Sequence, residues 1–277
     1  MNISIVIPTW NGKKLLQKII PGLLQLKSTE IIIVDNGSID ETAEYITQFP
    51  EITFITLSSN FGFTKAVNEG VKIAKSDYIL ILNNDCIITE QTITTLLQFL
   101  QQHNLVATQP VILKPDNSIE NIGYIVDLTK GKAKIITRVE ELSEIYKNHH
   151  ILHQKEYIWK AGNMYGLSAT CLLIKKDVFI TIGMLKESFH SYLEDVDLFI
   201  RLNKKGYPYA PCTKVEVIHQ HMSTSSKMGS YKQWHDFTNW IRIILGNYPR
   251  TFILTYFVPL TIERFRNLSG FVKKLIQ

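Results

Sequence analysis

The chain has 277 residues, enough to bury a large core either as one α/β domain with additions or as two domains. Its ordinary globular composition excludes a mainly disordered chain, and three cysteines without C-x-x-C spacing exclude a disulfide framework and a zinc ribbon. The net charge is +5, and residues 241–277, with six basic residues against one acidic residue, account for all of it, so a nucleic-acid-binding body is not supported.

The first residues are apolar, but the apolar stretch is short. No basic segment precedes it and it ends at Pro8, so we expect no secretory signal peptide. Cys86, Cys171 and Cys212 are expected to be free thiols, which favours a reducing, cytoplasmic location.

Short runs rich in β-branched residues alternate with helical patterns through the first hundred residues. Runs that are apolar almost throughout are typical of strands buried on both faces of a parallel sheet. Such runs cover residues 3–7, 31–34, 52–57 and 78–82, and helical patterns cover residues 13–27, 40–49, 64–74 and 89–102. The alternation predicts consecutive βαβ units, and therefore an α/β fold with a mostly parallel sheet flanked by helices.

Polar turn residues follow all four predicted strands, and ligands of such sheets bind outside the carboxyl ends of the strands. Asp35 and Asp85 come directly after buried runs, so they should share one rim. Asp35 could close an Asx-turn or bond to a nucleobase or ribose. Asp85 could lie in a surface turn or hold Mg²⁺ or Mn²⁺ on a diphosphate, since these ions usually take one or two protein carboxylates.

The pattern changes in the second half of the chain. Residues 114–156 are polar and weakly periodic, which indicates an insertion or an acceptor-side region. A regular apolar run reappears at residues 166–174. In residues 215–221, every second side chain would lie on the same face of a strand. His219 or His221 on one face of that strand could add a nitrogen ligand to a metal, or both could be ordinary surface histidines.

The segment from Tyr192 to Arg201 places three acids and an arginine in an apolar, helix-like run. A carboxylate at a helix N-terminus stays ionised easily because the helix dipole favours the charge. An ionised and positioned carboxylate is a general base. The alternative is a solvated helix start in which Asp197 pairs with Arg201 four residues later. The segment alone supports both interpretations.

Two common nucleotide-binding signatures are absent from the sequence. No G-x-G-x-x-G follows the first predicted strand, and no G-x-x-x-x-G-K-[ST] occurs. Dinucleotide dehydrogenases and P-loop proteins therefore lose their main support. Asn60 and Gly62, followed by Asn68 and Gly70, instead resemble a loop that enters a helix with its backbone N–H groups facing an anion.

Taken in order, five motifs resemble the family 2 glycosyltransferases of the GT-A fold, in particular their bacterial rhamnosyltransferase-like branch. The motifs are Val6-Ile-Pro-Thr-Trp-Asn11, Val34-Asp-Asn-Gly-Ser-x-Asp40, Asn60-Phe-Gly-Phe-x-x-Ala-x-Asn-x-Gly70, Leu82-Asn-Asn-Asp85 and Leu193-Glu-Asp-Val-Asp-Leu198 with Arg201. The resemblance runs from about residue 3 to about residue 225. It implies a GT-A domain at residues 1–230, with a nucleotide-binding half at 1–105 and an acceptor and catalytic half at 106–230. A basic, amphipathic helical tail would follow at residues 231–277.

The resemblance also implies roles for individual side chains. Asp195 would be the catalytic base, Glu194 would place the base or the acceptor, and Asp85 with His219 would bind Mg²⁺ or Mn²⁺. The residues expected to bind the nucleotide sugar are Thr9, Asn11, Asp35, Asn60, Lys65, Asn68 and Asn84. The D-x-D motif usual in the family begins here with Asn83, which leaves one carboxylate for the metal.

These roles describe an inverting displacement, in which a metal at Asp85 neutralises the departing diphosphate and Asp195 takes the proton of the acceptor hydroxyl. The resemblance implies transfer from a nucleoside-diphosphate sugar, with dTDP-rhamnose as a candidate. The acceptor would be a saccharide or a polyprenyl-diphosphate-linked saccharide in cell-surface polysaccharide synthesis. One alternative is a catalytically silent sugar-nucleotide-binding subunit of a membrane-associated assembly, which the presence of both aspartates disfavours. Another is a sugar-1-phosphate nucleotidyltransferase, whose Gly-rich basic loop after the first strand is absent.

The basic tail contains an uncharged stretch at residues 251–262. It is shorter than the roughly 20 apolar residues of a membrane-spanning helix. Flanked by basic side chains, it could lie on the anionic inner face of the cell membrane, where each nearby base contributes roughly 1 kcal/mol. The alternative is a helix packed against the catalytic domain. We favour membrane contact because a lipid-linked acceptor would be located there.

Overall fold

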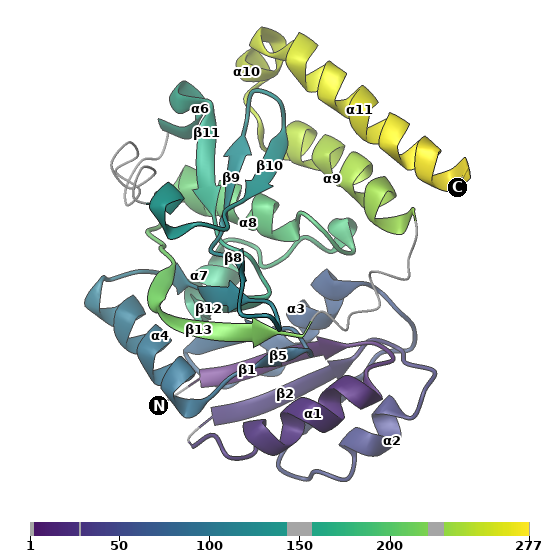
Figure 1. Cartoon of the computed structure of the whole chain (residues 1–277), viewed down its shortest axis with the longest axis vertical. Coiled ribbons are helices and arrows are strands. Elements are labelled where there is room, and N and C mark those ends of the chain that lie inside the picture. The colour runs from purple at the N-terminus through teal and green to yellow at the C-terminus, as the bar shows by residue number, and fades with distance from the viewer. Residues whose placement is uncertain (1–2, 28, 143–156, 221–229, 277) are drawn as a thin grey trace.

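The computed structural model describes residues 3–27, 29–142, 157–220 and 230–276. Its centre is a six-stranded sheet with the strand order β3-β2-β1-β4-β12-β6 (Figure 1). Four neighbouring strands of this sheet are parallel: β3 (Thr53–Thr56), β2 (Thr29–Asp35), β1 (Ile3–Thr9) and β4 (Tyr78–Leu82). Two strands complete it: β12 (Cys171–Lys175), which is antiparallel to β4, and β6 (Ala107–Thr108), which is antiparallel to β12. The predicted α/β fold with a mostly parallel sheet is confirmed.

Helices pack on both faces of the sheet because its strands are apolar on both faces. On one side, the isoleucines of β1 cluster with α1 (Lys13–Leu23) and α4 (Glu90–Gln102), near α2 (Thr42–Ile46). On the other side, Val6 packs under α3 (Phe63–Ile73). A Cβ on Gly70 would lie 2.4 Å from Val6 Cγ1, so glycine is required for α3 to approach β1 this closely. All four predicted strands and all four predicted helices of this region are present.

Two smaller sheets are built mainly from residues 106–230, the predicted acceptor and catalytic half. One contains β10 (Lys132–Ile135), β9 (Tyr124–Asp127) and β11 (Asn163–Gly166). The other contains β5 (Cys86–Ile87), β13 (Cys212–His219), β7 (Pro110–Leu113) and β8 (Ile119–Asn121). Short helical segments connect these parts: α6 (Tyr157–Ala161), α7 (Lys176–Thr181) and the 3₁₀ turn η1 (Glu187–Phe189).

Two sequence interpretations of this half need refinement. The apolar run at residues 166–174 is divided between the end of β11 and the start of β12, which belong to different sheets, and a turn lies between them. The weakly periodic region contains β8, β9 and β10, whereas residues 143–156 and His221 lie outside the described residues. Hydrophobic periodicity missed the division because the turn, which contains Ser168 and Thr170, is short and itself mostly buried.

The chain ends in three helices that follow α8 (Glu194–Lys205) and β13: α9 (Tyr231–Asn247), α10 (Arg250–Thr255) and α11 (Phe257–Ile276). They gather at the end of the molecule opposite α1 and α2, with α11 running along α9 (Figure 1). The Arg264 guanidinium lies 5.2 Å from the centre of the Trp240 ring and donates to the carbonyl of Gly131 in the turn between β9 and β10. The predicted C-terminal helical extension is therefore present, and one of its faces is packed.

Candidate active site

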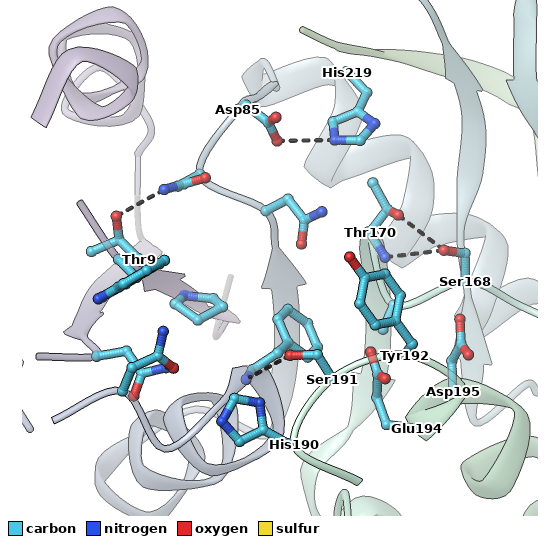
Figure 2. A pocket seen from close by; sticks show the side chains of 18 of the residues that line it. Thr9, Asp85, Ser168, Thr170, His190, Ser191, Tyr192, Glu194, Asp195 and His219 are labelled. Carbon is cyan, nitrogen blue, oxygen red and sulfur yellow. Dashed lines mark hydrogen bonds and ion pairs between the residues drawn. The ribbon is translucent and has the colours of Figure 1, made fainter. Parts of the chain in front are cut away.

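A cavity of about 440 Å³ opens at the carboxyl ends of β1 and β4, facing the loop that precedes α8 (Figure 2). Seven of the predicted site residues line it: Thr9, Asn60, Asn84, Asp85, Glu194, Asp195 and His219. The structure thus brings together side chains that are more than 200 positions apart in the sequence. The other four predicted residues, Asn11, Asp35, Lys65 and Asn68, are not part of the lining.

Asp35 and Asn11 shape the turns at the rim. Oδ1 of Asp35 accepts the backbone N–H of Ser38 at 3.1 Å, which is the Asx-type turn considered from the sequence. Its Oδ2 is buried and has no hydrogen-bond partner among the described residues. Oδ1 of Asn11 accepts the backbone N–H of Ile39 at 2.9 Å. Both residues hold the turns at the rim without lining the cavity. Their contacts with a nucleotide stay predictions.

Lys65 and Asn68 connect α3 to the segment before α8. Lys65 forms ion pairs with Glu69 at 2.7 Å and with Glu187 at 3.3 Å. The amide nitrogen of Asn68 donates to the carbonyl of Leu185 at 2.8 Å, and its oxygen accepts the N–H of the same residue at 3.2 Å. These bonds hold the segment before α8 against α3. Direct contacts of Lys65 and Asn68 with a nucleotide sugar stay predictions.

Asn36, in the turn after β2, lines the cavity but was not singled out from the sequence. Its amide nitrogen donates to Asn60 Oδ1 at 2.9 Å, and its oxygen accepts the backbone N–H of Phe61 at 2.9 Å. Nearby, Asn84 donates to Thr9 Oγ1 at 2.8 Å. Side-chain bonds thus join the loops after neighbouring strands into one polar wall. The available signal was the Asp-Asn-Gly turn, in which only the aspartate was considered.

Hydroxyl and aromatic side chains outside the predicted site residues form another part of the lining. Ser168 and Thr170 come from the turn between β11 and β12, and His190 and Tyr192 precede α8 (Figure 2). Tyr231, from the first turn of α9, lies with its hydroxyl 2.6 Å from His190 Nδ1. Only Tyr192 adjoins a recognisable motif, so spacing along the chain gave no signal for the others.

His219 lies beside Asp85 at one side of the cavity (Figure 2), and Glu120 lies next to its other ring nitrogen. Its Nε2 is 3.0 Å from Asp85 Oδ1, and its Nδ1 is 3.0 Å from Glu120 Oε2. Burial lowers the pKa of His219, but hydrogen bonds and charge attraction from Asp85 and Glu120 outweigh burial and raise the pKa to about 9. The imidazole therefore carries a proton here, and a cation binding at Nε2 has to displace it.

The donor atoms at this position fit a divalent cation. Ligand atoms of Asp85, Cys86 and His219 lie within 4.8 Å of one another, and Oδ2 of Asp85 is buried without a hydrogen-bond partner among the described residues. Burial raises the pKa of the Cys86 thiol well above its usual value, so the thiol stays protonated and is a poor ligand. The oxygen of Asp85 and the nitrogen of His219 remain, and diphosphate oxygens and water can complete the shell of Mg²⁺ or Mn²⁺.

Glu194 and Asp195 begin α8 at another side of the cavity (Figure 2). Glu194 is 8% exposed and Asp195 is half-buried. Burial raises the pKa of both carboxyl groups, and the charge of Asp195 raises the pKa of Glu194 further. The rise is smaller at Asp195 because the backbone N–H groups of Val196 and Ala169 donate to its carboxylate. Asp195 therefore ionises first as the pH rises and is the member of the pair that is available to accept a proton, whereas Glu194 holds its own proton to higher pH.

Asp197, the third acid of this segment, is structural. It is fully buried, and its two oxygens lie 2.7 Å from Arg201 Nε and 2.8 Å from Lys186 Nζ. Asn247 of α9 donates to it at 2.7 Å. The predicted pairing four residues apart is confirmed for Asp197 with Arg201, whereas Glu194 and Asp195 of the same helix line the cavity.

Residues 4–183, more than half of the chain, match the model of glycosyl transferase family 2. The chain belongs to glycosyl transferase family 2. The predicted family is confirmed.

Curated relatives of this glycosyltransferase carry related names. Glycosyltransferase GlyG of Streptococcus pneumoniae serotype 4 is 30% identical over 183 residues, which cover 64% of this chain and 58% of GlyG. The N-acetylglucosaminyl-diphospho-decaprenol L-rhamnosyltransferase of Mycobacterium tuberculosis is 25% identical over 210 residues, covering 70% of this chain and 67% of the relative. O-antigen biosynthesis protein RfbC of Myxococcus xanthus is 24% identical, and the match spans 81% of this chain but 18% of RfbC. The glycosyltransferase thus spans less than two thirds of GlyG and RfbC.

Solved structures show that the fold of this glycosyltransferase is GT-A. Staphylococcus aureus TarS residues 1–349 superpose with a TM-score of 0.61 at 14% identity, covering 96% of this chain and 72% of that one. The mannosyltransferase PcManGT of Pyrobaculum calidifontis, solved with GDP-Man and Mn²⁺, gives a TM-score of 0.58 at 13% identity, covering 97% and 74%. At these identities the likeness concerns the fold, and it agrees with the strand order described above.

Proposed function

We propose that this glycosyltransferase moves a sugar from a nucleoside-diphosphate donor to an acceptor hydroxyl, with inversion at the anomeric carbon. One observation carries the proposal: a cation-binding pair, Asp85 and His219, and a proton acceptor, Asp195, line different sides of one cavity. A single displacement needs positive charge beside the leaving diphosphate and a base beside the attacking hydroxyl. The cavity offers both.

In the proposed reaction the acceptor oxygen bonds to the anomeric carbon while the bond from that carbon to the diphosphate breaks. The hydroxyl proton passes to the carboxylate of Asp195, and the electron pair of the broken bond stays on the departing diphosphate. A divalent cation held by Asp85 and His219 supplies positive charge beside that oxygen when bound. Glu194 keeps the base and the acceptor in place.

The donor nucleotide lies against the polar wall at the carboxyl ends of the parallel strands. Thr9, Asn60 and Asn84 of this wall face the cavity. Asn84 donates to Thr9 and Asn36 donates to Asn60, and these bonds hold the side chains ready for a nucleotide sugar. We propose that four residues outside the lining help to bind the nucleotide sugar: Asn11, Asp35, Lys65 and Asn68. Among them, Asp35 has a buried oxygen with no described partner, which suits a donor group on the nucleoside.

We propose dTDP-rhamnose as the donor and a polyprenyl-diphosphate-linked saccharide as the acceptor, in cell-surface polysaccharide synthesis. The name of the mycobacterial relative, which specifies an L-rhamnosyltransferase and a diphospho-decaprenol, supports this pair. A relative from Staphylococcus epidermidis named poly-beta-1,6-N-acetyl-D-glucosamine synthase supports polysaccharide synthesis more broadly.

A panel of nucleotide sugars tests the donor and the metal together. We expect dTDP-rhamnose to raise the melting temperature and to be hydrolysed slowly, both more strongly with Mn²⁺ than with a chelator, while UDP-N-acetylglucosamine and GDP-mannose have smaller effects. Turnover of another donor would correct the sugar and keep the reaction. Binding without turnover of any donor, even with lipid-linked acceptors present, would favour the catalytically silent binding subunit.

One face of α10 and α11 carries large apolar side chains exposed to solvent. They are Leu254, Phe257, Val258, Ile262, Phe265, Val272 and Leu275, and Leu254 is 76% exposed. The spacing on α11 is that of one helix face. Exposed basic residues stand beside them: Arg250, Arg266, Lys273 and Lys274. The opposite face is packed, with Leu260 and Glu263 buried, so packing against the domain and an exposed amphipathic face occur in the same helix.

We further propose that this face lies on the cytoplasmic, anionic surface of the cell membrane, where a lipid-linked acceptor is reached. No helix in the described part of the chain is long and apolar enough to cross a membrane. An amphipathic helix with apolar and basic side chains on one face suits binding in the membrane surface.

Replacing the four exposed bases of this face by glutamine, R250Q, R266Q, K273Q and K274Q together, tests the contact. Each base near an anionic membrane contributes roughly 1 kcal/mol, so binding to phosphatidylglycerol vesicles should weaken by about two to three orders of magnitude at low salt. The matched control removes four exposed lysines elsewhere: K14Q, K27Q, K75Q and K114Q. Equal binding of both variants, or association of the protein with itself without vesicles, would contradict the proposal.

A further inference from the structure

The loop that leads into α8 has an unusual backbone. His190, Tyr192 and Leu193 have φ angles of 60°, 67° and 63°, in the left-handed region that residues with side chains avoid. Leu193 directly precedes Glu194 and Asp195, so the conformation of this loop sets where the acid pair begins. A loop with three such residues persists only when its surroundings hold it in place.

Asn239 supplies this support from α9. It is fully buried, and its amide nitrogen lies within hydrogen-bond distance of the carbonyl oxygens of Phe189 (3.1 Å), Ser191 (2.9 Å) and Tyr192 (2.7 Å). The amide has two N–H groups, so the three carbonyls share them. Arg242 donates to Oδ1 of Asn239 at 2.6 Å, which fixes the amide with its nitrogen toward the loop.

The carbonyls that Asn239 binds belong to a segment that forms the cavity itself. Ser191, Tyr192 and Leu193 line the cavity next to the acid pair. On the other side of the loop, the backbone N–H of Thr64 donates to the carbonyl of His190 at 3.2 Å. The loop is thus held between α3 of the nucleotide-binding half and α9 of the C-terminal helices. Release of either contact frees the backbone that carries the first turn of α8.

We propose that Asn239 is a positioning residue, which holds the loop before α8 and thereby sets the place of the Asp195 carboxylate in the reaction. The inference rests on the proposed function, because Asp195 acts as base there. It also gives α9 a part in catalysis, although this helix follows the matched family region and contributes no acid of its own to the cavity.

Asn247 provides a matched control on the same helix. It is also a buried asparagine that ties α9 to α8, but it donates to Asp197, which keeps its ion pairs with Lys186 and Arg201 when Asn247 is removed. Loss of either asparagine should lower the melting temperature. Only the loss of Asn239 should release the loop that lines the cavity.

The test compares Asn239→Ala with Asn247→Ala in the full chain. We expect Asn239→Ala to lower kcat about 10- to 100-fold, since a base displaced by about 1 Å can cost that much, while the dissociation constant for the nucleoside diphosphate stays within about twofold. Asn247→Ala should keep kcat within about threefold. If Asn239→Ala does not fold, Asn239→Ser, which keeps one donor, is measured in the same way.

Amide hydrogen exchange in residues 187–196 gives a readout that needs no substrate. We expect exchange there to rise at least about tenfold in Asn239→Ala and to stay unchanged in Asn247→Ala. Unchanged exchange would overturn the inference even if no donor is ever turned over. Faster exchange with unchanged kcat would overturn the catalytic role of Asn239 and leave the transferase proposal intact.

Discussion

The Asp195→Asn substitution is expected to lower kcat by about a thousandfold, while the affinity for the nucleoside diphosphate stays within about twofold of the wild type. The Asp195→Asn side chain keeps its shape and its oxygen can still accept the backbone N–H groups of Val196 and Ala169, so the local structure should persist. The neutral amide cannot take the proton of the acceptor hydroxyl. Initial rates at saturating donor and acceptor give kcat, and calorimetric titration gives the nucleotide affinity.

The pH dependence of the wild type provides an internal check on this assignment. Burial raises the pKa of Asp195, so the base is present above this raised pKa and is lost as the pH falls through it. The acid limb of kcat should therefore lie above the pKa of about 4 that is usual for aspartate. Glu194→Gln should show the same fall of kcat at low pH, and its kcat should be less than about tenfold below that of the wild type. Wild-type kcat with an unchanged limb in Asp195→Asn would show that another group accepts the proton.

The Asp85→Asn variant is expected to lose Mn²⁺ affinity and turnover together, each by about a hundredfold or more. Lewis-acid stabilisation of a leaving group is worth several kcal/mol, and about 3 kcal/mol corresponds to roughly a hundredfold in rate. The substitution turns the charged carboxylate of Asp85, including its buried Oδ2, into a neutral amide. Electron paramagnetic resonance of added Mn²⁺ measures the affinity, and a chelator titration measures the dependence of the rate on metal.

Cys86→Ala is the matched control for the metal position. The thiol lies in the same group of three donor atoms, but burial raises its pKa and keeps it protonated, so we expect Mn²⁺ affinity within about threefold of the wild type. A large loss in Cys86→Ala would make the thiol a ligand. Equal Mn²⁺ affinity in Asp85→Asn and the wild type, with turnover insensitive to chelator, would remove the metal from the proposed reaction.

The parallel part of the fold could be predicted because its signals are local. Each buried strand is a continuous apolar run, and the polar residue that ends it marks the rim, as Asp35 and Asp85 do. The acid pair was predictable for a similar reason, since Glu194 and Asp195 interrupt an apolar helix at its start. These features depend on neighbours in the sequence, which is why they could be read from it.

The remaining parts of the site depend on contacts between distant segments. Glu120 comes from β8, in a region of weak periodicity, and meets His219 only because β8 and β13 belong to one sheet. Tyr231 and His190 are 41 residues apart and come together through the packing of α9. Neither contact leaves a pattern along the chain. The division of the apolar run at residues 166–174 was missed because both of its halves are buried.

The two faces of α11 have a consequence for experiments that shorten this protein. Cutting the chain near Gly246 would remove the exposed apolar side chains of α10 and α11. It would also remove the buried side chains of Tyr248, Phe252 and Leu260 and the hydrogen bond from Arg264 to the carbonyl of Gly131. The underlying surface of α9 would be uncovered, and with it the helix that carries Asn239. A shortened chain would therefore confound loss of membrane binding with loss of structure, and substitutions confined to the outer face separate the two.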